Sequence, residues 1–209
     1  MQQRARDLPE TLALPLDGGA EWWYWLGGRP ALDVVNTMRE RWRRRVETLV
    51  TPEDLGLWLV CAELVDERPN VSAGLLDEAR ALREAIDRCV TARIDGHRAP
   101  GAAVKQIDRW LPEAAPLAQL SANGDGGLIF GERPARDPAR RAVAAIAFDA
   151  ARMLGMPEQA NRVRICASET CSTRFYDRSP AGRRRWCSME LCGNQAKARR
   201  HRATRRSAA

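Results

Sequence analysis

The 209-residue chain contains 44% hydrophobic and 29% charged residues, proportions typical of a globular protein rather than a disordered or fibrous one. This length suffices for one domain of ordinary size and a small second one. No apolar run approaches the roughly 18 residues that a membrane helix needs, and the N-terminus MQQRARDLPE lacks the apolar stretch of a signal peptide. We therefore expect a cytoplasmic protein without membrane contact.

The net charge of +7 is distributed unevenly along the chain. Residues 161–209 contain 13 Lys and Arg against 3 Asp and Glu, a balance of +10. Residues 1–160 contain the remaining 21 basic and 24 acidic residues, a balance of −3. A basic end on a weakly acidic body is typical of proteins that bind nucleic acid through one segment, and a solvated basic tail is the alternative.

The first 47 residues contain an irregular segment, a short aromatic segment and a segment with helical periodicity. Residues 1–20 contain prolines and a Gly-Gly pair without periodicity, so we expect them to be loosely ordered. EWWYWL at residues 21–26 predicts an early strand or a hairpin arm. ALDVVNTMRERWRRRVE at residues 31–47 predicts a helix, because apolar residues recur on one face: Leu32, Val35, Met38 and Trp42.

The middle of the chain predicts more helices and one hairpin. Thr51-Pro52-Glu53-Asp54 begins a helix, since threonine caps, proline suits the first helical position and acids suit the first turn. Helical periodicity covers residues 72–93, 102–111 and 139–155, and Pro112 and Pro116 end the second of these. Residues 117–120 and 127–130 flank SANGDG, which predicts a β-hairpin. We therefore expect an α+β protein with a mainly helical domain and small sheet over residues 21–158.

Four of the six cysteines form a regular pattern near the C-terminus. Cys61 and Cys89 stand alone in segments with helical periodicity, and we interpret them as buried small apolar residues. The others follow the spacing Cys166-x4-Cys171, fifteen residues, Cys187-x4-Cys192. Two close pairs separated by a hairpin-sized insert suit tetrahedral Zn²⁺ with Zn–S distances of about 2.3 Å. An iron–sulfur cluster stays open as an alternative, and disulfides are disfavoured in a reducing compartment.

The pattern predicts one structural Zn²⁺ in a small treble-clef-like finger over residues 162–209, without an open ligand position for catalysis. The insert STRFYDRSPAGRRRW predicts a β-hairpin between the two ligand pairs, with residues 179–182 as its turn. Phe175 and Trp186 are the predicted apolar cover of the metal. SMELCGNQAKARRHRATRR then predicts a basic C-terminal helix capped by Ser188.

The positive charge of this segment exceeds what the metal centre needs. Four thiolates and Zn²⁺ sum to −2, so after that charge is offset the segment stays near +8, which favours contact with nucleic acid. A DNA-binding transcription regulator is the leading interpretation, and an RNA-binding or protein-interaction module is the alternative. The predicted contact residues are Arg183, Arg184, Arg185, Asn194, Gln195, Lys197, Arg199, Arg200, Arg202 and Arg205.

Three other functions have less support in the residues. Neither of the two histidines, His97 and His201, has a recognisable triad or metal partner nearby, so we predict that the protein is not an enzyme. The indoles of Trp22, Trp23 and Trp25 suggest either a pocket for a small-molecule effector or core packing. A homodimer would add base contacts to a single finger, although no coiled-coil seam is present.

Two segments resemble known families. WCSMELCGNQAKARRHR resembles the signature of the CGNR zinc-finger family, and the preceding CASETCSTRFYDRSPAGRRRWCSM is similar to the rest of that finger. GGRPALDVVNTMRER and TPEDLGLWL resemble the ABATE domain found with it. The resemblance implies a bacterial transcription regulator whose finger contacts DNA and whose N-terminal domain senses an effector. Gln195 stands where the signature has arginine, which removes one bidentate phosphate or guanine partner.

Overall fold

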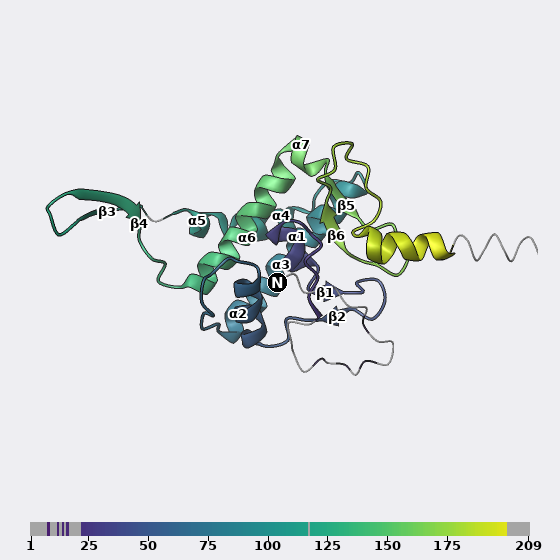
Figure 1. Cartoon of the computed structure of the whole chain (residues 1–209), viewed down its shortest axis with the longest axis horizontal. Coiled ribbons are helices and arrows are strands. Elements are labelled where there is room, and N and C mark those ends of the chain that lie inside the picture. The colour runs from purple at the N-terminus through teal and green to yellow at the C-terminus, as the bar shows by residue number, and fades with distance from the viewer. Residues whose placement is uncertain are drawn as a thin grey trace, which may run out of the picture.

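The structure is a computed structural model that describes residues 8, 12, 14, 16, 22–116 and 118–199. Its helical body is built around the long helix α3 (Ala73–Ile94) (Figure 1). The other α-helices are α1 (Pro30–Val35), α2 (Pro52–Cys61), α4 (Gly101–Asp108), α5 (Leu111–Ala114), α6 (Pro138–Gly155) and α7 (Pro157–Ala160). The predicted loosely ordered N-terminus lies mostly outside the described residues.

Three small antiparallel sheets of two strands each occur in the described part of the chain. They pair β1 (Met38–Arg39) with β2 (Val46–Glu47), β3 (Ala118–Ala122) with β4 (Leu128–Glu132), and β5 (Val163–Ile165) with β6 (Arg174–Tyr176). The predicted α+β class is therefore confirmed. No helix within the described residues is both long and apolar enough to cross a membrane.

The core lies where α3, α6 and α1 meet, and apolar side chains of the two long helices occupy it. Leu82 and Ile86 of α3 and Ile146 and Met153 of α6 are almost completely buried. Helix α2 begins with the predicted cap: Thr51 Oγ1 accepts from Asp54 N at 3.3 Å, and Asp54 Oδ2 accepts from Thr51 N at 2.8 Å. These local signals act within a few residues, so the sequence predicts them well.

The predicted helix over residues 31–47 is wrong beyond Val35. Thr37 donates its hydroxyl to the Val34 carbonyl at 2.6 Å, a local bond that competes with continued helix. The chain then turns through positive φ angles at Glu40 (47°) and Arg45 (54°), between β1 and β2. Trp42 is consequently 48% exposed instead of facing the core.

Three smaller expectations also differ from the structure. The EWWYWL segment has no strand pairing over its described residues 22–26. Pro112 lies in the first turn of α5, where a missing N–H costs nothing, so it begins a helix rather than ending α4. Cys89 is buried as expected, but Cys61 is exposed because α2 ends there at the surface.

The predicted hairpin around SANGDG is confirmed as β3–β4, with Leu120 opposite Phe130 and Ala122 opposite Leu128. Gly126 supplies the positive φ of its turn, 79°. The hairpin stands away from the helices as an arm (Figure 1).

Candidate metal centre and nucleic-acid interface

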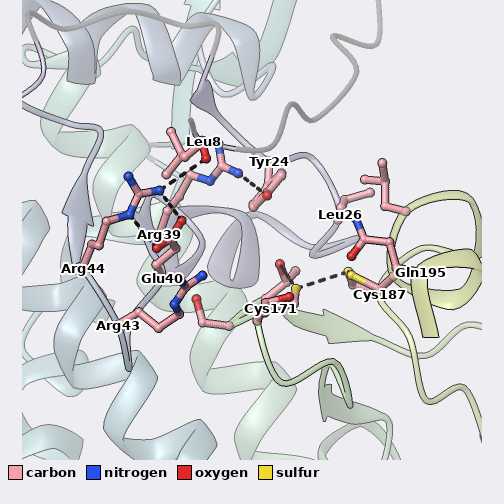
Figure 2. A pocket seen from close by; sticks show the side chains of 15 residues that line it. Leu8, Tyr24, Leu26, Arg39, Glu40, Arg43, Arg44, Cys171, Cys187 and Gln195 are labelled. Atoms are coloured by element: carbon pink, nitrogen blue, oxygen red, sulfur yellow. Dashed lines mark hydrogen bonds and ion pairs between the residues drawn. The ribbon is translucent and has the colours of Figure 1, made fainter. Parts of the chain in front are cut away.

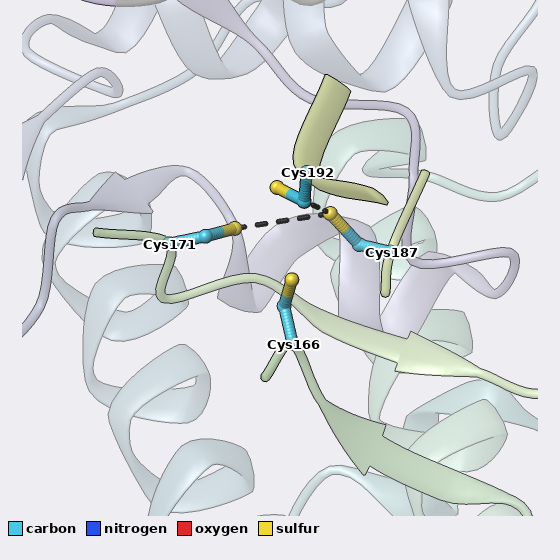
Figure 3. Close-up of side chains that lie close together, drawn as sticks. All are labelled: Cys166, Cys171, Cys187 and Cys192. Atoms are coloured by element: carbon cyan, nitrogen blue, oxygen red, sulfur yellow. Dashed lines mark hydrogen bonds between the residues drawn. The ribbon is translucent and has the colours of Figure 1, made fainter. Parts of the chain in front are cut away.

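The first ligand pair lies in the connection between β5 and β6. Cys166 follows β5 directly, and its N–H donates to Thr173 O at 2.9 Å, which closes the loop. Cys171 precedes β6, and its N–H donates to Ser168 O at 3.0 Å. Backbone bonds thus fold both sulfurs toward one point (Figure 3).

The expected hairpin between the two ligand pairs is wrong, because β6 pairs with β5 upstream of Cys166. Val163 of β5 is 1% exposed and belongs to the main core, so the helical body holds this strand beside β6. Only one backbone bond, from Ala167 N to Arg185 O at 2.8 Å, joins the segment after the turn to the first ligand loop.

The second ligand pair is built on a single π-helical turn, η2 (Met189–Gly193), which contains Cys192 and begins two residues after Cys187. Ser188 caps it as predicted, accepting from Leu191 N at 3.3 Å. A Cβ on Gly193 would lie 2.8 Å from the Met189 side chain, so glycine permits this tight turn. Helical backbone continues through residues 194–199.

The four sulfur atoms have the spacing of ligands to one ion. All lie within 4.8 Å of one another, with Sγ–Sγ distances of 3.8 Å for Cys171–Cys187 and 3.7 Å for Cys187–Cys192. A tetrahedral ion with Zn–S bonds of about 2.3 Å requires sulfurs about 3.8 Å apart. A disulfide would bring two sulfurs to about 2.05 Å, and a four-iron cluster, with one iron per cysteine, would spread them further. The donor set therefore fits a single Zn²⁺.

The surroundings of the sulfurs suit a metal site. Cys166, Cys187 and Cys192 are buried, and Phe175 and Trp186 pack against them as predicted. Bonding from Cys171, and also from Cys187 and Cys192, lowers the pKa of the Cys166 thiol far below its usual value. The contact with Cys166 raises the pKa of the Cys187 thiol above its usual value. The thiols therefore do not ionise independently, and a bound cation favours the thiolate form of all four.

Comparison with known families identifies both parts of the chain. Residues 28–157 match the ABATE family model, described as "Putative stress-induced transcription regulator". The chain belongs to the ABATE family. Residues 162–205 match the CGNR zinc finger, so the four cysteines hold one structural Zn²⁺. A search of the curated proteins finds no match, and neither matching family is described as an enzyme.

The ABATE segment (residues 28–157) holds the CGNR finger through buried polar contacts that the sequence did not reveal. Asn36 donates from Nδ2 to Arg174 O and accepts at Oδ1 from Arg174 N, both at 2.9 Å. Arg174 Nε also lies 2.7 Å from Asp87 Oδ1 of α3. Tyr176 N donates to Gly27 O at 2.8 Å. Asn36 belongs to the ALDVVNT segment that resembles the ABATE domain, but no pattern in the sequence indicated its contact with the finger.

A cavity of about 270 Å³ separates the β1–β2 hairpin from the metal centre (Figure 2). Its lining includes Arg43 and Arg44 from the ABATE segment and Thr170 and Gln195 from the finger. Figure 2 shows Gln195 above the cysteines, beside Leu26. The structure therefore places the variant signature position at the junction between finger and ABATE segment.

The expected nucleic-acid residues fall into two groups. Arg183, Arg184 and Arg185 line a concavity of about 420 Å³ together with Trp186 and Met189. Arg199 donates to Thr170 Oγ1 at 3.3 Å, on the side where Gln195 lies. Exposed side chains of Asn194 and Lys197 extend from the same helical turns. Three further predicted contact residues lie outside the described residues: Arg200, Arg202 and Arg205.

Within the first group the three arginines have different roles. Arg184 supports the finger, since its N–H donates to Asp177 Oδ2 at 2.8 Å and its Nη2 donates to Cys187 O at 2.6 Å. The guanidinium of Arg185 lies 5.3 Å from the Trp186 ring centroid. Arg183 makes no side-chain hydrogen bond or ion pair within the described part of the chain.

The three tryptophans proposed for a ligand pocket take part in packing. Trp23 is 1% exposed and donates from Nε1 to Thr48 O at 3.2 Å. Trp25 stacks on Trp58 with ring centroids 5.6 Å apart. Trp22 packs in a small cluster with Leu8, Leu12, Leu16, Val46 and Val50.

Proposed function

We propose that the CGNR finger binds nucleic acid, with DNA as the main partner, and that the chain is a zinc-dependent transcription regulator of the bacterial cytoplasm. In this proposal residues 21–158 form the body that carries a nucleic-acid-binding module over residues 162–209. The thiolate zinc site supports the cytoplasmic assignment, because reducing compartments keep such ligands from forming disulfides.

One observation carries the proposal: three exposed cations of the finger have no acidic partner within the described residues, although a fourth, Arg199, lies 3.8 Å from Glu169. Arg183, Arg185 and Lys197 are exposed, and none pairs with an acid in the described part of the chain. Within the ABATE segment, some arginines are held by acids: Arg83 lies 2.6 Å from Glu47, and Arg140 lies 2.6 Å from Glu113. Unpaired cations on a rigid surface attract phosphates and release counterions when they bind.

The zinc ion supports this surface indirectly. Arg184 anchors the backbone between Arg183 and Arg185 to Cys187, so the metal-bound loop fixes the backbone that carries both exposed side chains. Trp186 forms the wall of the same concavity, next to the half-exposed Met189. A planar indole with flanking cations can contact bases or sugars as well as phosphates.

The test compares two triple variants that remove equal charge. The first is Arg183→Ala, Arg185→Ala and Lys197→Ala in one chain, and the control is Arg88→Ala, Arg133→Ala and Arg136→Ala, which lie exposed in the ABATE segment. Binding of zinc-loaded full chain to duplex DNA is measured by fluorescence anisotropy at several salt concentrations. We expect the first variant to flatten the log–log salt dependence by about 0.9 per lost phosphate contact, whereas the control keeps the wild-type slope.

Two results would contradict the proposal. One is an equal loss of affinity in both variants, which would indicate attraction by net charge alone. The other is the absence of binding by a protein shown to contain one zinc per chain. Equal affinity for structured RNA would favour the RNA-binding alternative, and chelation of the metal should abolish binding to either polymer.

A further inference from the structure

The β3–β4 arm has one apolar face that nothing in the described structure covers. Directly opposed residues of an antiparallel pair share a face, so Leu120, Ala122, Leu128 and Phe130 lie together. Leu120 is 63% exposed, Leu128 72% and Phe130 78%. An isolated two-stranded hairpin is marginally stable in water, and an apolar patch of this kind marks a contact surface.

A second unpartnered apolar surface lies elsewhere on the same chain. A groove of about 330 Å³ runs between the end of α3, α4 and the end of α6. Its floor and walls are Val104, Ile107, Leu111, Ala151 and Leu154, and Val104 is 47% exposed. The arm is convex and the groove concave, and both are apolar.

We propose that two copies of this chain form a dimer in which each β3–β4 arm lies in the groove of the other copy. The arm stands away from its own helices in Figure 1, so a second molecule can reach its apolar face. Reciprocal exchange gives a closed two-fold arrangement, in which the same pair of surfaces meets twice.

Charge complementarity favours the arm of a second copy as the occupant of the groove. Residues 118–132 of the arm contain Asp125 and Glu132 and no basic residue. Residues 93–109, which form two sides of the groove, contain four Lys or Arg against two Asp. Glu132 lies 3.7 Å from Arg141 of its own chain, so Asp125 remains as the acid of the arm without an ion pair in the described structure. This charge favours contact with the groove over contact with a second arm.

The buried area points the same way. The exposed parts of one Phe and two Leu side chains amount to about 400 Å² per arm. Contact between two arms would bury only about 800 Å² in total, below the roughly 1,200–2,000 Å² of a stable interface. Two arm–groove contacts cover the walls of both grooves in addition to both arms, so they bury more surface than contact between two arms does.

The experiment measures the mass of the zinc-loaded full chain by sedimentation equilibrium over a wide concentration range, without nucleic acid. The wild type should dimerise. The arm variant Leu128→Ser with Phe130→Ser, and the groove variant Val104→Glu, should each raise the dissociation constant by about tenfold or more. Ile129→Ser, on the polar face of the same hairpin, should leave it unchanged. Circular dichroism and zinc content verify that every variant is folded.

A mixture of arm and groove variants separates this arrangement from others. Its heterodimers retain one intact arm–groove contact, so the mixture should associate more tightly than either variant alone. A wild type that stays monomeric would overturn the proposal, as would a groove variant that dimerises normally. Because no nucleic acid is present, these outcomes are independent of whether the finger binds DNA.

Discussion

The β5–β6 and β3–β4 hairpins use their apolar residues in opposite ways. The shorter pair has three residues in each strand, yet Val163 and Phe175 are at most 1% exposed. The longer pair has five residues in each strand, and its Phe130 is 78% exposed. The number of paired residues therefore does not decide whether a hairpin is anchored.

The two hairpins differ in the groups that contact them. The β5–β6 hairpin receives two bonds from Asn36, an ion pair from Asp87 and the sulfurs of a zinc site. The β3–β4 hairpin has a single ion pair at its base, 3.7 Å between Glu132 and Arg141. We expect substitutions in the two hairpins to have correspondingly different effects on stability.

The largest difference in stability should appear when one phenylalanine of each hairpin is replaced by alanine. Phe175→Ala leaves a cavity in a closed core beside the metal, so it should lower the free energy of unfolding by about 3–5 kcal/mol. Phe130→Ala removes an exposed ring and should change it by less than about 0.5 kcal/mol. Urea unfolding of zinc-saturated protein, at concentrations low enough to keep it monomeric, measures both. Equal losses would show that the arm packs against its own chain.

A smaller loss of stability should follow when the junction between the ABATE segment and the finger loses a polar contact. Asn36→Ala leaves the buried N–H and C=O of Arg174 without their partner, so stability should fall by about 3 kcal/mol. Zinc content should stay at one per chain, while hydrogen exchange at the Arg174 amide accelerates. Asn70→Ala removes an exposed amide of the same kind and serves as the control. Unchanged exchange at Arg174 would mean that the zinc site alone holds β6.

The smallest effect concerns Asp33, which accepts from Gly27 N at 2.7 Å next to the β6 contact. Burial, together with the nearby Asp149, raises the pKa of Asp33 to about 7, above its unfolded value of 3.8. The folded state thus binds the extra proton, and stability falls as the pH rises from about 4 to 7.

Asp33→Asn keeps an acceptor for Gly27 but cannot ionise. Because Asp33 keeps partial solvent contact, we expect this variant to be more stable than the wild type by only about 2 kcal/mol at pH 8. The advantage should shrink toward acidic pH, measured by thermal unfolding of zinc-loaded protein. Asp66→Asn, at an exposed position, should show no such trend. A constant difference across pH would mean that Asp33 is ionised throughout.

Sequence patterns predicted the local parts of both hairpins well. The Asn-Gly and Asp-Gly pairs placed the β3–β4 turn, because glycine is needed where φ is positive. The cysteine spacing predicted all four metal ligands, and Ser188 was correctly placed as the cap of the second ligand turn. The partner of β6 was missed, because three strand-like residues can pair with segments on either side.

By itself the sequence determined what depends on residues a few positions apart: the Thr51–Asp54 capping box, the helical faces of α3 and α6, and the two cysteine pairs. Only the tertiary structure decided which hairpin is buried and which strand pairs with β6. Asn36 bonds Arg174, 138 positions along the chain, and no local pattern contains that contact. Burial and pairing depend on such distant neighbours, whereas caps, turns and metal-ligand spacing depend on near ones.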